Sequence, residues 1–376
     1  YSDGGNAWDY FTHDQARSRA YHWGEDGLGG ICDQKQRLCF ALALWNGNDP
    51  ILKERLFGLT NGEGNHGEDV KEYYFYLDST PTHSFMKYLY KYPQAAYPYD
   101  NLVATNRQRG KGDLEYELLD TGVFNEDRYF DVFIEYAKAT PEDMLIEITI
   151  ANRGPEAATL HVLPTLWFRN TWSWGGADES KRPRMRAANG VIVAEAPDLG
   201  THTLELAPGA ADPTLLFTDN VTNAARLWNA PNESPYVKDA FHERVVRRRE
   251  DAVNSEQRGT KAAAWCHLRV PVGGEVVVRL RLRKHHGALA SAPLGSWRAF
   301  NALFDQRISE ADAFYAAPPR YHATMRPQER LVARQAAAGL LWSKQYYFFD
   351  IPAWLDGDAA PPRPPEGRKS GRNAEW

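Results

Sequence analysis

The sequence has few cysteines and no group of them with a repeated spacing. There are three in 376 residues: Cys32, Cys39 and Cys266. An odd number without close pairing argues against a disulfide scaffold and favours a reducing compartment. CxxC pairs are also absent, so the sequence offers no zinc site of the usual spacing. We therefore expect no metal, no cofactor and a cytoplasmic location.

Long apolar runs and a strong charge excess are also missing. No stretch approaches the length of a membrane span. Lys and Arg total 44 and Asp and Glu total 49, which gives a formal net charge of −5. Two short basic runs, 181–186 and 247–249, are better explained as solvated loop or strand faces than as a polyanion site. We expect neither a nucleic acid nor a membrane as a partner.

The motifs of several enzyme classes are absent. The chain contains no GxSxG elbow, no Walker A loop and no dinucleotide-binding glycine fingerprint. The HxE at His66 to Glu68 lacks the PCxxC that zinc deaminases need beside it. Serine hydrolases, nucleotide-binding enzymes and zinc deaminases therefore have no support in the sequence.

Aromatic residues, in contrast, are abundant at 12% of the chain. Flat rings stack on the faces of pyranose sugars, but large β-sheet cores use aromatic residues as well. Composition alone therefore leaves sugar binding and core packing equally open.

Alternating apolar and polar residues predict a mainly β fold. Strands are predicted at 36–45, 129–138, 144–152, 159–168, 190–194, 201–206, 214–218, 262–270 and 275–282. Two more β-rich runs within 70–93 flank a predicted hairpin turn at Asp78 to Pro81. The first 35 residues show no period and are predicted to be an ordered loop. Short strands with frequent turns favour a large antiparallel β super-sandwich.

The pattern changes near Gly295. Apolar residues at helical spacing predict helices over 297–315 and 327–347. The proline-rich stretch 359–372 is predicted to be a linker or a surface loop. We predict three parts: a β-sandwich domain over 1–294, helices over 295–358, and over 359–376 a proline-rich loop that leads to a further domain outside the chain.

Gly-rich loops with carboxylates beside aromatic residues supply the first candidate binding groups. Loops at strand ends are where sandwiches present polar side chains. The candidates for a substrate rim are Trp23, Glu25, Asp26, His66, Glu68 and Asp69. The competing interpretation is that these side chains cap turns and seal one loop onto another. That interpretation is favoured, because no spacing here dictates a reaction.

The segment WFRNTWSW at 167–174 supplies the remaining candidates. In an extended chain Trp172 and Trp174 would project to the same side, where two indoles could hold a sugar. Arg169 or Asn170 could then reach the sugar hydroxyls. Packing in the core or against another domain is the commoner use of such aromatic residues.

Several long segments closely resemble bacterial members of glycoside hydrolase family 63, glucosidases related to mannosyl-oligosaccharide glucosidase, which is processing α-glucosidase I. The resemblance covers essentially the whole chain. The segments are 8–27, 63–78, 86–94, 152–175 and 340–350.

The resemblance implies an amino-terminal β super-sandwich followed by an (α/α)6 toroid, and an inverting mechanism with one carboxylic acid and one carboxylate base. In the family both carboxylates lie in the toroid, beyond the position of Trp376. No acidic residue here matches them, so the resemblance implies no catalytic residue in this chain.

The chain is then expected to be the amino-terminal part of an α-glucosidase, inactive alone, that supports the toroid and the rim of its pocket. Its expected partners are a glucoside or oligosaccharide substrate and its own carboxy-terminal catalytic domain. Two alternatives stay open: a non-catalytic carbohydrate-binding module and a purely structural β-sandwich.

Overall fold

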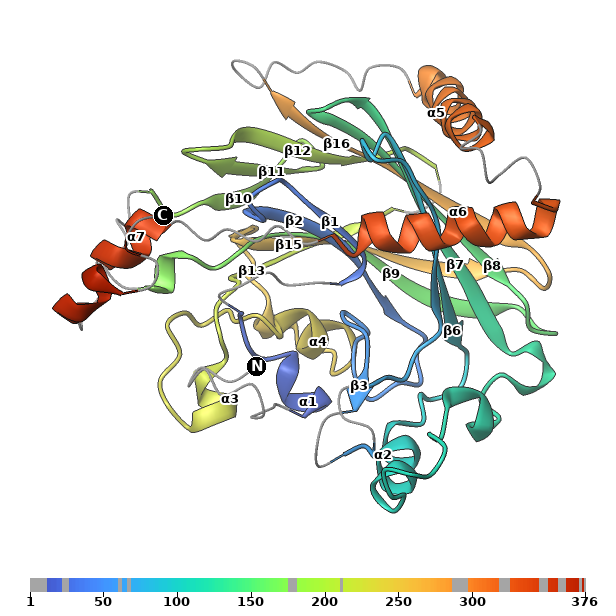
Figure 1. The fold of residues 1–376 in the computed structure, drawn as a ribbon, viewed down its shortest axis with the longest axis horizontal. Coiled ribbons are helices and arrows are strands. Elements are labelled where there is room, and N and C mark those ends of the chain that lie inside the picture. Colours follow the sequence, from blue (N-terminus) through green and yellow to red (C-terminus); the bar gives the residue numbers. More distant parts are fainter. Residues whose placement is uncertain are drawn as a thin grey trace.

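Two antiparallel sheets face each other and form the body of the protein (Figure 1). The computed structural model describes residues 12–21, 27–59, 63–65, 69–174, 181–209, 212–285, 297–317, 325–344, 351–357, 363–371 and 374. The five-stranded sheet has the order β1-β2-β9-β15-β13, and the nine-stranded sheet has the order β14-β10-β11-β12-β16-β8-β7-β6-β5. The prediction of a mainly β, antiparallel fold is confirmed.

The elements have the following bounds. The five-stranded sheet consists of β1 (Leu28–Cys32), β2 (Leu38–Trp45), β9 (Ala158–Phe168), β13 (Thr214–Thr218) and β15 (Lys261–Val270). The nine-stranded sheet consists of β5 (Tyr74–Ser79), β6 (Phe85–Pro93), β7 (Tyr129–Thr140), β8 (Asp143–Asn152), β10 (Arg184–Ala188), β11 (Val191–Ala196), β12 (Gly200–Leu206), β14 (Arg258–Gly259) and β16 (Glu275–His285). The short strands β3 (Gly58–Leu59) and β4 (Asp69–Val70) pair with each other. The helices are α1 (His13–Ala16), α2 (Tyr99–Arg107), α3 (Ala224–Trp228), α4 (Ala240–Val245), α5 (Arg298–Ala316), α6 (Pro327–Trp342) and α7 (Ile351–Asp356).

The core lies between the two sheets and follows from the alternation within each strand. In β2 the side chains of Leu38, Phe40, Leu42 and Leu44 all belong to the central cluster. The residues between them face the opposite side of the sheet, because successive side chains of a strand alternate. Each fully buried large apolar side chain contributes about 1.5–3 kcal/mol to folding, so this central cluster is the main source of stability.

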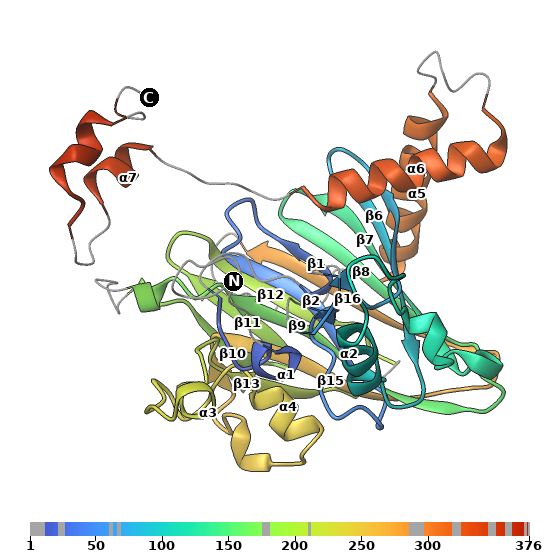
Figure 2. The same cartoon turned by 60° about the horizontal axis from the view of Figure 1, so that its bottom comes forward.

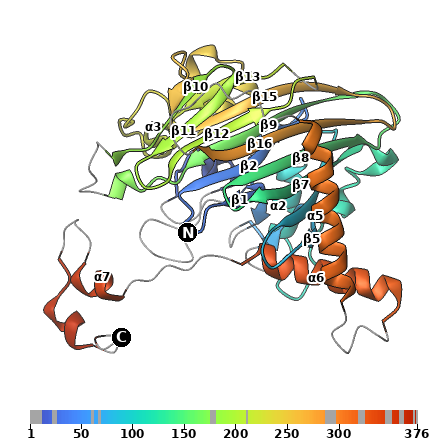
Figure 3. The same ribbon diagram turned by 90° about the horizontal axis from the view of Figure 1, so that it is seen from above.

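Helices α5 and α6 pack near the β5 to β8 end of the nine-stranded sheet (Figure 3). Phe300 and Phe304 of α5 join a buried cluster on the outer face of that sheet. The helix α6 lies along the edge strand β5. Its last residue, Trp342, packs among three tyrosine rings and donates a hydrogen bond of 3.3 Å to the carbonyl of Gly30. Helix α7 lies apart from the sandwich (Figure 2).

The sequence patterns located most strands but misplaced two features. The predicted hairpin is present as the antiparallel pair β5–β6. The stretch predicted as loop at the start of the chain contains α1 and β1, a single capped turn of helix and a glycine-containing strand too short to show a period. The helix predicted to reach 347 ends at Trp342, with Ser343 as its C-cap. The aromatic run that follows, 346–349, consists of weak helix formers.

Candidate functional site

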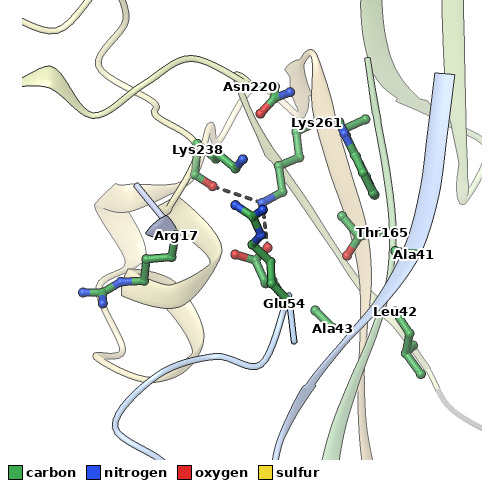
Figure 4. Close-up of a pocket in the computed structure, with 11 residues that line it drawn as sticks. Arg17, Ala41, Leu42, Ala43, Glu54, Thr165, Asn220, Lys238 and Lys261 are labelled. Carbon is green, nitrogen blue, oxygen red and sulfur yellow. Dashed lines mark hydrogen bonds and ion pairs between the residues drawn. The ribbon is translucent and has the colours of Figure 1, made fainter. Parts of the chain in front are cut away.

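A small cavity with charged side chains around it lies on the outer face of the five-stranded sheet (Figure 4). Its volume is about 40 Å³. Strands β2, β9 and β15 form its floor, and the segments around Arg17, Glu54 and Lys238 cover it. The described ends of one predicted candidate loop meet charged side chains here, which makes this cavity the candidate site.

Small side chains on the outer face create the space for this cavity. Ala41 of β2 and Ala263 of β15 are both register partners of Thr165 in β9, so these three side chains form one row across the sheet. Directly opposite residues of an antiparallel pair share a face. Longer charged side chains can therefore enter from the covering segments and from the next row.

The charged groups around the cavity are joined to one another. The Lys261 ammonium donates hydrogen bonds to Oε1 of Glu54 at 2.6 Å and to the backbone carbonyl of Lys238 at 3.1 Å (Figure 4). Lys261 is only 4% exposed. Arg17, also buried, pairs with Asp14. Because a buried charge is tolerated only with such partners, the contacts of Lys261 fix the segments around Glu54 and Lys238 on the sheet.

The cavity is suited to water and not to a sugar. One water molecule needs about 10–15 Å³ of such space, so a volume of about 40 Å³ admits very few. Pockets for small organic ligands span roughly 300–1,000 Å³. The indole Nε1 of Trp167 is buried at the cavity and has no hydrogen-bond partner among the residues that the structure describes, so a water molecule there would satisfy it.

A second polar group, which we call the buried ion-pair cluster, consists of Asp49, Lys53, Glu72, Tyr92 and Tyr97. Lys53 forms an ion pair with Glu72, and both side chains are 0% exposed. Tyr92 donates its hydroxyl proton to Asp49, which also accepts from the backbone N–H of Tyr97 at 2.5 Å. The Lys53 ammonium lies 4.1 Å from the centroid of the Tyr97 ring, a cation–π contact. The cluster thus joins the loop after β2 to the start and end of the β5–β6 hairpin.

The pKa values of the two carboxyl groups in this cluster are raised. Burial raises the pKa of Asp49 and of Glu72, and the nearby ammonium of Lys53 opposes both shifts. Raised carboxyl pKa values are a property of general acids in active sites. Neither group lines the cavity, however, and Glu72 is sealed from solvent. The cluster therefore holds the loops together and has no access to a substrate.

The histidine of α1 extends the cluster toward the cavity. The ring of His13 lies 4.6 Å from that of Phe57 and 4.8 Å from that of Tyr99, centroid to centroid. Burial, followed by the charges of Lys53, Arg55 and Arg17, lowers the pKa of His13 well below its usual value. His13 is accordingly neutral at physiological pH and acts as a packing residue between α1 and the cluster.

The first predicted loop begins and ends at the cavity. Trp23, Glu25 and Asp26 lie outside the described residues. Before them, the ring of Tyr21 lies 4.5 Å from the guanidinium carbon of Arg55 and 5.2 Å from the Lys238 ammonium. After them, Gly27 packs so closely that an added Cβ would lie 2.6 Å from Cβ of Ala41.

The second predicted loop contacts a different part of the molecule. His66 and Glu68 lie outside the described residues. Asn65 is buried and donates hydrogen bonds to the carbonyls of Gly110 and Asp113, at 3.2 and 3.3 Å. Asp69 begins β4, where it pairs with Leu59. The described ends of the two loops therefore attach to separate elements, and the rim role of their acidic residues stays a prediction.

The three candidates in the segment after β9 have different surroundings. Arg169 donates hydrogen bonds to the carbonyls of Gln36 at 3.1 Å and Lys35 at 3.2 Å, which ties the end of β9 to the turn between β1 and β2. Trp172 begins the 3-10 turn η3 (Trp172–Trp174), is 7% exposed and belongs to the central core cluster. The guanidinium carbon of Arg182 lies 5.1 Å from its ring. The side chain of Trp174 lies outside the described part.

The core position of Trp172 gives a first prediction. Trp172→Ala should lower the free energy of unfolding by about 3 kcal/mol, the lower end of the usual cost of removing a buried indole. Trp172→Phe, which keeps a ring in place, should recover more than half of the loss. Urea unfolding monitored by circular dichroism measures both. Unchanged stability in Trp172→Ala would place this side chain on the surface and favour the sugar-rim interpretation.

Sequence reasoning missed the charged residues that organise this region. Lys53, Glu72 and Lys261 do not occur in a motif with recognisable spacing. Lys261 offers one local signal, since it stands directly before the three alanines Ala262–Ala264 at the start of its strand.

Two features are absent from the described ranges. Their histidine, cysteine and acidic side chains form no group of three or more that could hold a metal ion. Among the helices that the structure describes, none has both the length and the apolar character to traverse a bilayer.

Comparison with known proteins identifies a relative of unknown role. No family model matches the chain. The chain is 42% identical over 418 aligned residues to "Uncharacterized protein YMR196W" of Saccharomyces cerevisiae. The alignment covers the whole of this chain and 38% of the yeast protein. The two are homologues, and this chain spans well under half of its relative.

A solved structure was also matched, at low similarity. A "putative aldose 1-epimerase" from Escherichia coli K12 overlaps with a TM-score of 0.27 and 11% identity, over 60% of this chain and 74% of that one.

Proposed function

We propose that this chain is the amino-terminal β-sandwich of a larger carbohydrate-active enzyme, an inverting α-glucosidase of the family 63 type. The observation that carries the proposal is the match to a longer homologue. All of this chain aligns with only 38% of that homologue, which supports a further domain in the full-length protein. The resemblance of segments such as 8–27 and 152–175 to family 63 supplies the reaction class.

The buried carboxylates agree with a supporting role for the sandwich. An inverting glycosidase needs an acid and a base about 6.5–9.5 Å apart on either side of an open sugar site. Asp49 and Glu72 have raised pKa values, but they lie in a sealed cluster. In this proposal the acid and base come from a carboxy-terminal catalytic domain, and the sandwich supports it and lends loops to the pocket rim. The proposed location is the cytoplasm.

Exposed apolar side chains of α6 support a partner domain beside this helix. Leu331, Val332 and Leu340 are 55%, 65% and 78% exposed. Trp342, at the carboxyl end of the same helix, is held by the sandwich. Large apolar side chains that stay exposed on a helix commonly face a second partner. In this proposal the catalytic domain covers these three side chains.

The stereochemistry of hydrolysis by the longer protein tests the proposal. The full-length protein that contains this chain should release β-glucose from an α-glucoside, because water attacks opposite the leaving group. Proton NMR during the first minutes of the reaction distinguishes the anomers before mutarotation. Release of α-glucose would contradict the inverting mechanism, and the absence of hydrolysis across aryl α-glucosides and glucose disaccharides would contradict the glucosidase assignment.

A further inference from the structure

Two of the three cysteines face each other across neighbouring strands. Cys32 of β1 and Cys39 of β2 are direct register partners. The N–H of Asp33 donates to the carbonyl of Leu38 at 3.2 Å, which makes that pair a hydrogen-bonded one. Hydrogen-bonded and non-hydrogen-bonded pairs alternate along an antiparallel ladder, so Cys32 and Cys39 form a non-hydrogen-bonded pair with Cα atoms about 4.5 Å apart. Disulfides join Cα atoms that are about 4.4–6.8 Å apart.

The turn between the strands holds this pair in register. Oδ1 of Asp33 accepts hydrogen bonds from the backbone N–H groups of Arg37 at 2.5 Å and Leu38 at 2.8 Å. Arg169 anchors the same turn from β9 through the carbonyls of Lys35 and Gln36. The two thiols are therefore placed before any bond forms between them, which reduces the motion needed to join them.

The two thiols differ in access. Cys32 is exposed and lies on β1, an edge strand of its sheet. Cys39 is 3% exposed and packs with Ala41 and Trp167. Desolvation of its sulfur and the charge of Asp33 raise the pKa of Cys32 to about 11, against the opposing charge of Arg169. Since the thiolate is the reacting form, Cys32 reacts first and slowly.

We infer that Cys32 and Cys39 are an oxidation site that a low-molecular-weight disulfide, such as glutathione disulfide, converts into an intramolecular disulfide. Deprotonated Cys32 attacks one sulfur of the small disulfide and expels the other as a thiolate. Cys39 then loses its proton and attacks the Cys32 sulfur of this mixed disulfide, which releases the second small thiolate. Two protein thiols are oxidised, and one small disulfide is reduced to two thiols.

Thiol counting on the whole chain tests the inference. The folded protein is incubated with glutathione disulfide at mildly alkaline pH, quenched with acid, and alkylated with N-ethylmaleimide after denaturation. The mass should show one alkyl group, on Cys266, where the untreated protein has three. Lys35 and Arg37 lie between the pair, so trypsin should yield two peptides joined through Cys32 and Cys39.

Matched variants separate the two steps. Cys39→Ala should keep glutathione on Cys32, because the resolving thiol is missing, and Cys266→Ser should form the same joined peptides as the natural sequence. Three alkyl groups after oxidation of the natural sequence, or glutathione that persists on Cys32 while Cys39 is alkylated, would overturn the inference. The tryptic map of the natural sequence decides the question even where a variant fails to fold.

Discussion

The chain of 376 residues by itself is expected to hydrolyse no α-glucoside. A positioned acid or base contributes about 10²–10⁴-fold each to such a reaction. Without the pair, turnover should fall at least 10⁴-fold below that of the longer protein. The measurement compares purified chain and full-length protein at equal concentration, with an aryl α-glucoside that reports slow release of the phenol.

The control for this experiment is the folded state of the isolated chain. Its circular dichroism should show a β protein with a cooperative thermal transition, so that inactivity cannot be assigned to unfolding. Turnover that survives purification and is lost in Glu25→Gln or Asp69→Asn would contradict the prediction. It would place the chemistry in the two loops that the sequence first indicated.

Removing Lys53 is expected to have the largest effect on stability. Lys53→Met leaves the carboxylate of Glu72 buried without its partner, and breaking a buried pair from one side costs about 3–5 kcal/mol. Glu72 already has a raised pKa, and the loss of the ammonium raises it further. The penalty is therefore absent below the pKa of Glu in the unfolded chain, where the group is neutral in both states. It grows as the pH rises above that value and is full only above the raised pKa of Glu72 in the folded variant. Urea unfolding at neutral and acidic pH measures the difference.

Two control variants isolate the cause of this effect. Lys53→Met combined with Glu72→Leu removes both charges and should recover most of the loss, because an apolar pair of similar volume can replace a buried ion pair. Lys284→Met breaks the ion pair with Glu142 on the surface, where about 0–1 kcal/mol is expected. Equal losses in Lys53→Met and Lys284→Met would show that burial does not matter here.

Most of the fold prediction came from the alternation of apolar and polar residues along the strands. A strand such as β8 buries every second residue, including Ile146, Ile148 and Ile150, and this period is visible without any knowledge of neighbours. The same period cannot find β1, which spans five residues and contains two glycines. The mistaken loop assignment also hid the cysteine pair, because Cys32 and Cys39 become neighbours only when β1 and β2 form a hairpin.

The polar interior could not be predicted from the sequence for a different reason. Lys53 and Glu72 are 19 residues apart, and Asp49 and Tyr92 are 43 apart. No local spacing connects them, and each residue type is usually exposed or unremarkable in a strand. Their contacts depend on the way the loops of the two sheets converge, which is a property of the assembled sandwich.

The position of α6 has a consequence for the solubility of the protein. The strand β5 ends the nine-stranded sheet, and an uncovered edge strand offers free backbone donors and acceptors to a strand of another molecule. The helix lies along this edge, with Arg334 paired to Asp78 and Trp342 packed on Tyr76. The helix thus occupies the position beside β5 where a strand of another molecule would pair. Loss of α6 would expose the edge of β5 to pairing with strands of other molecules. The helix is therefore expected to reduce fibre-like aggregation of the protein.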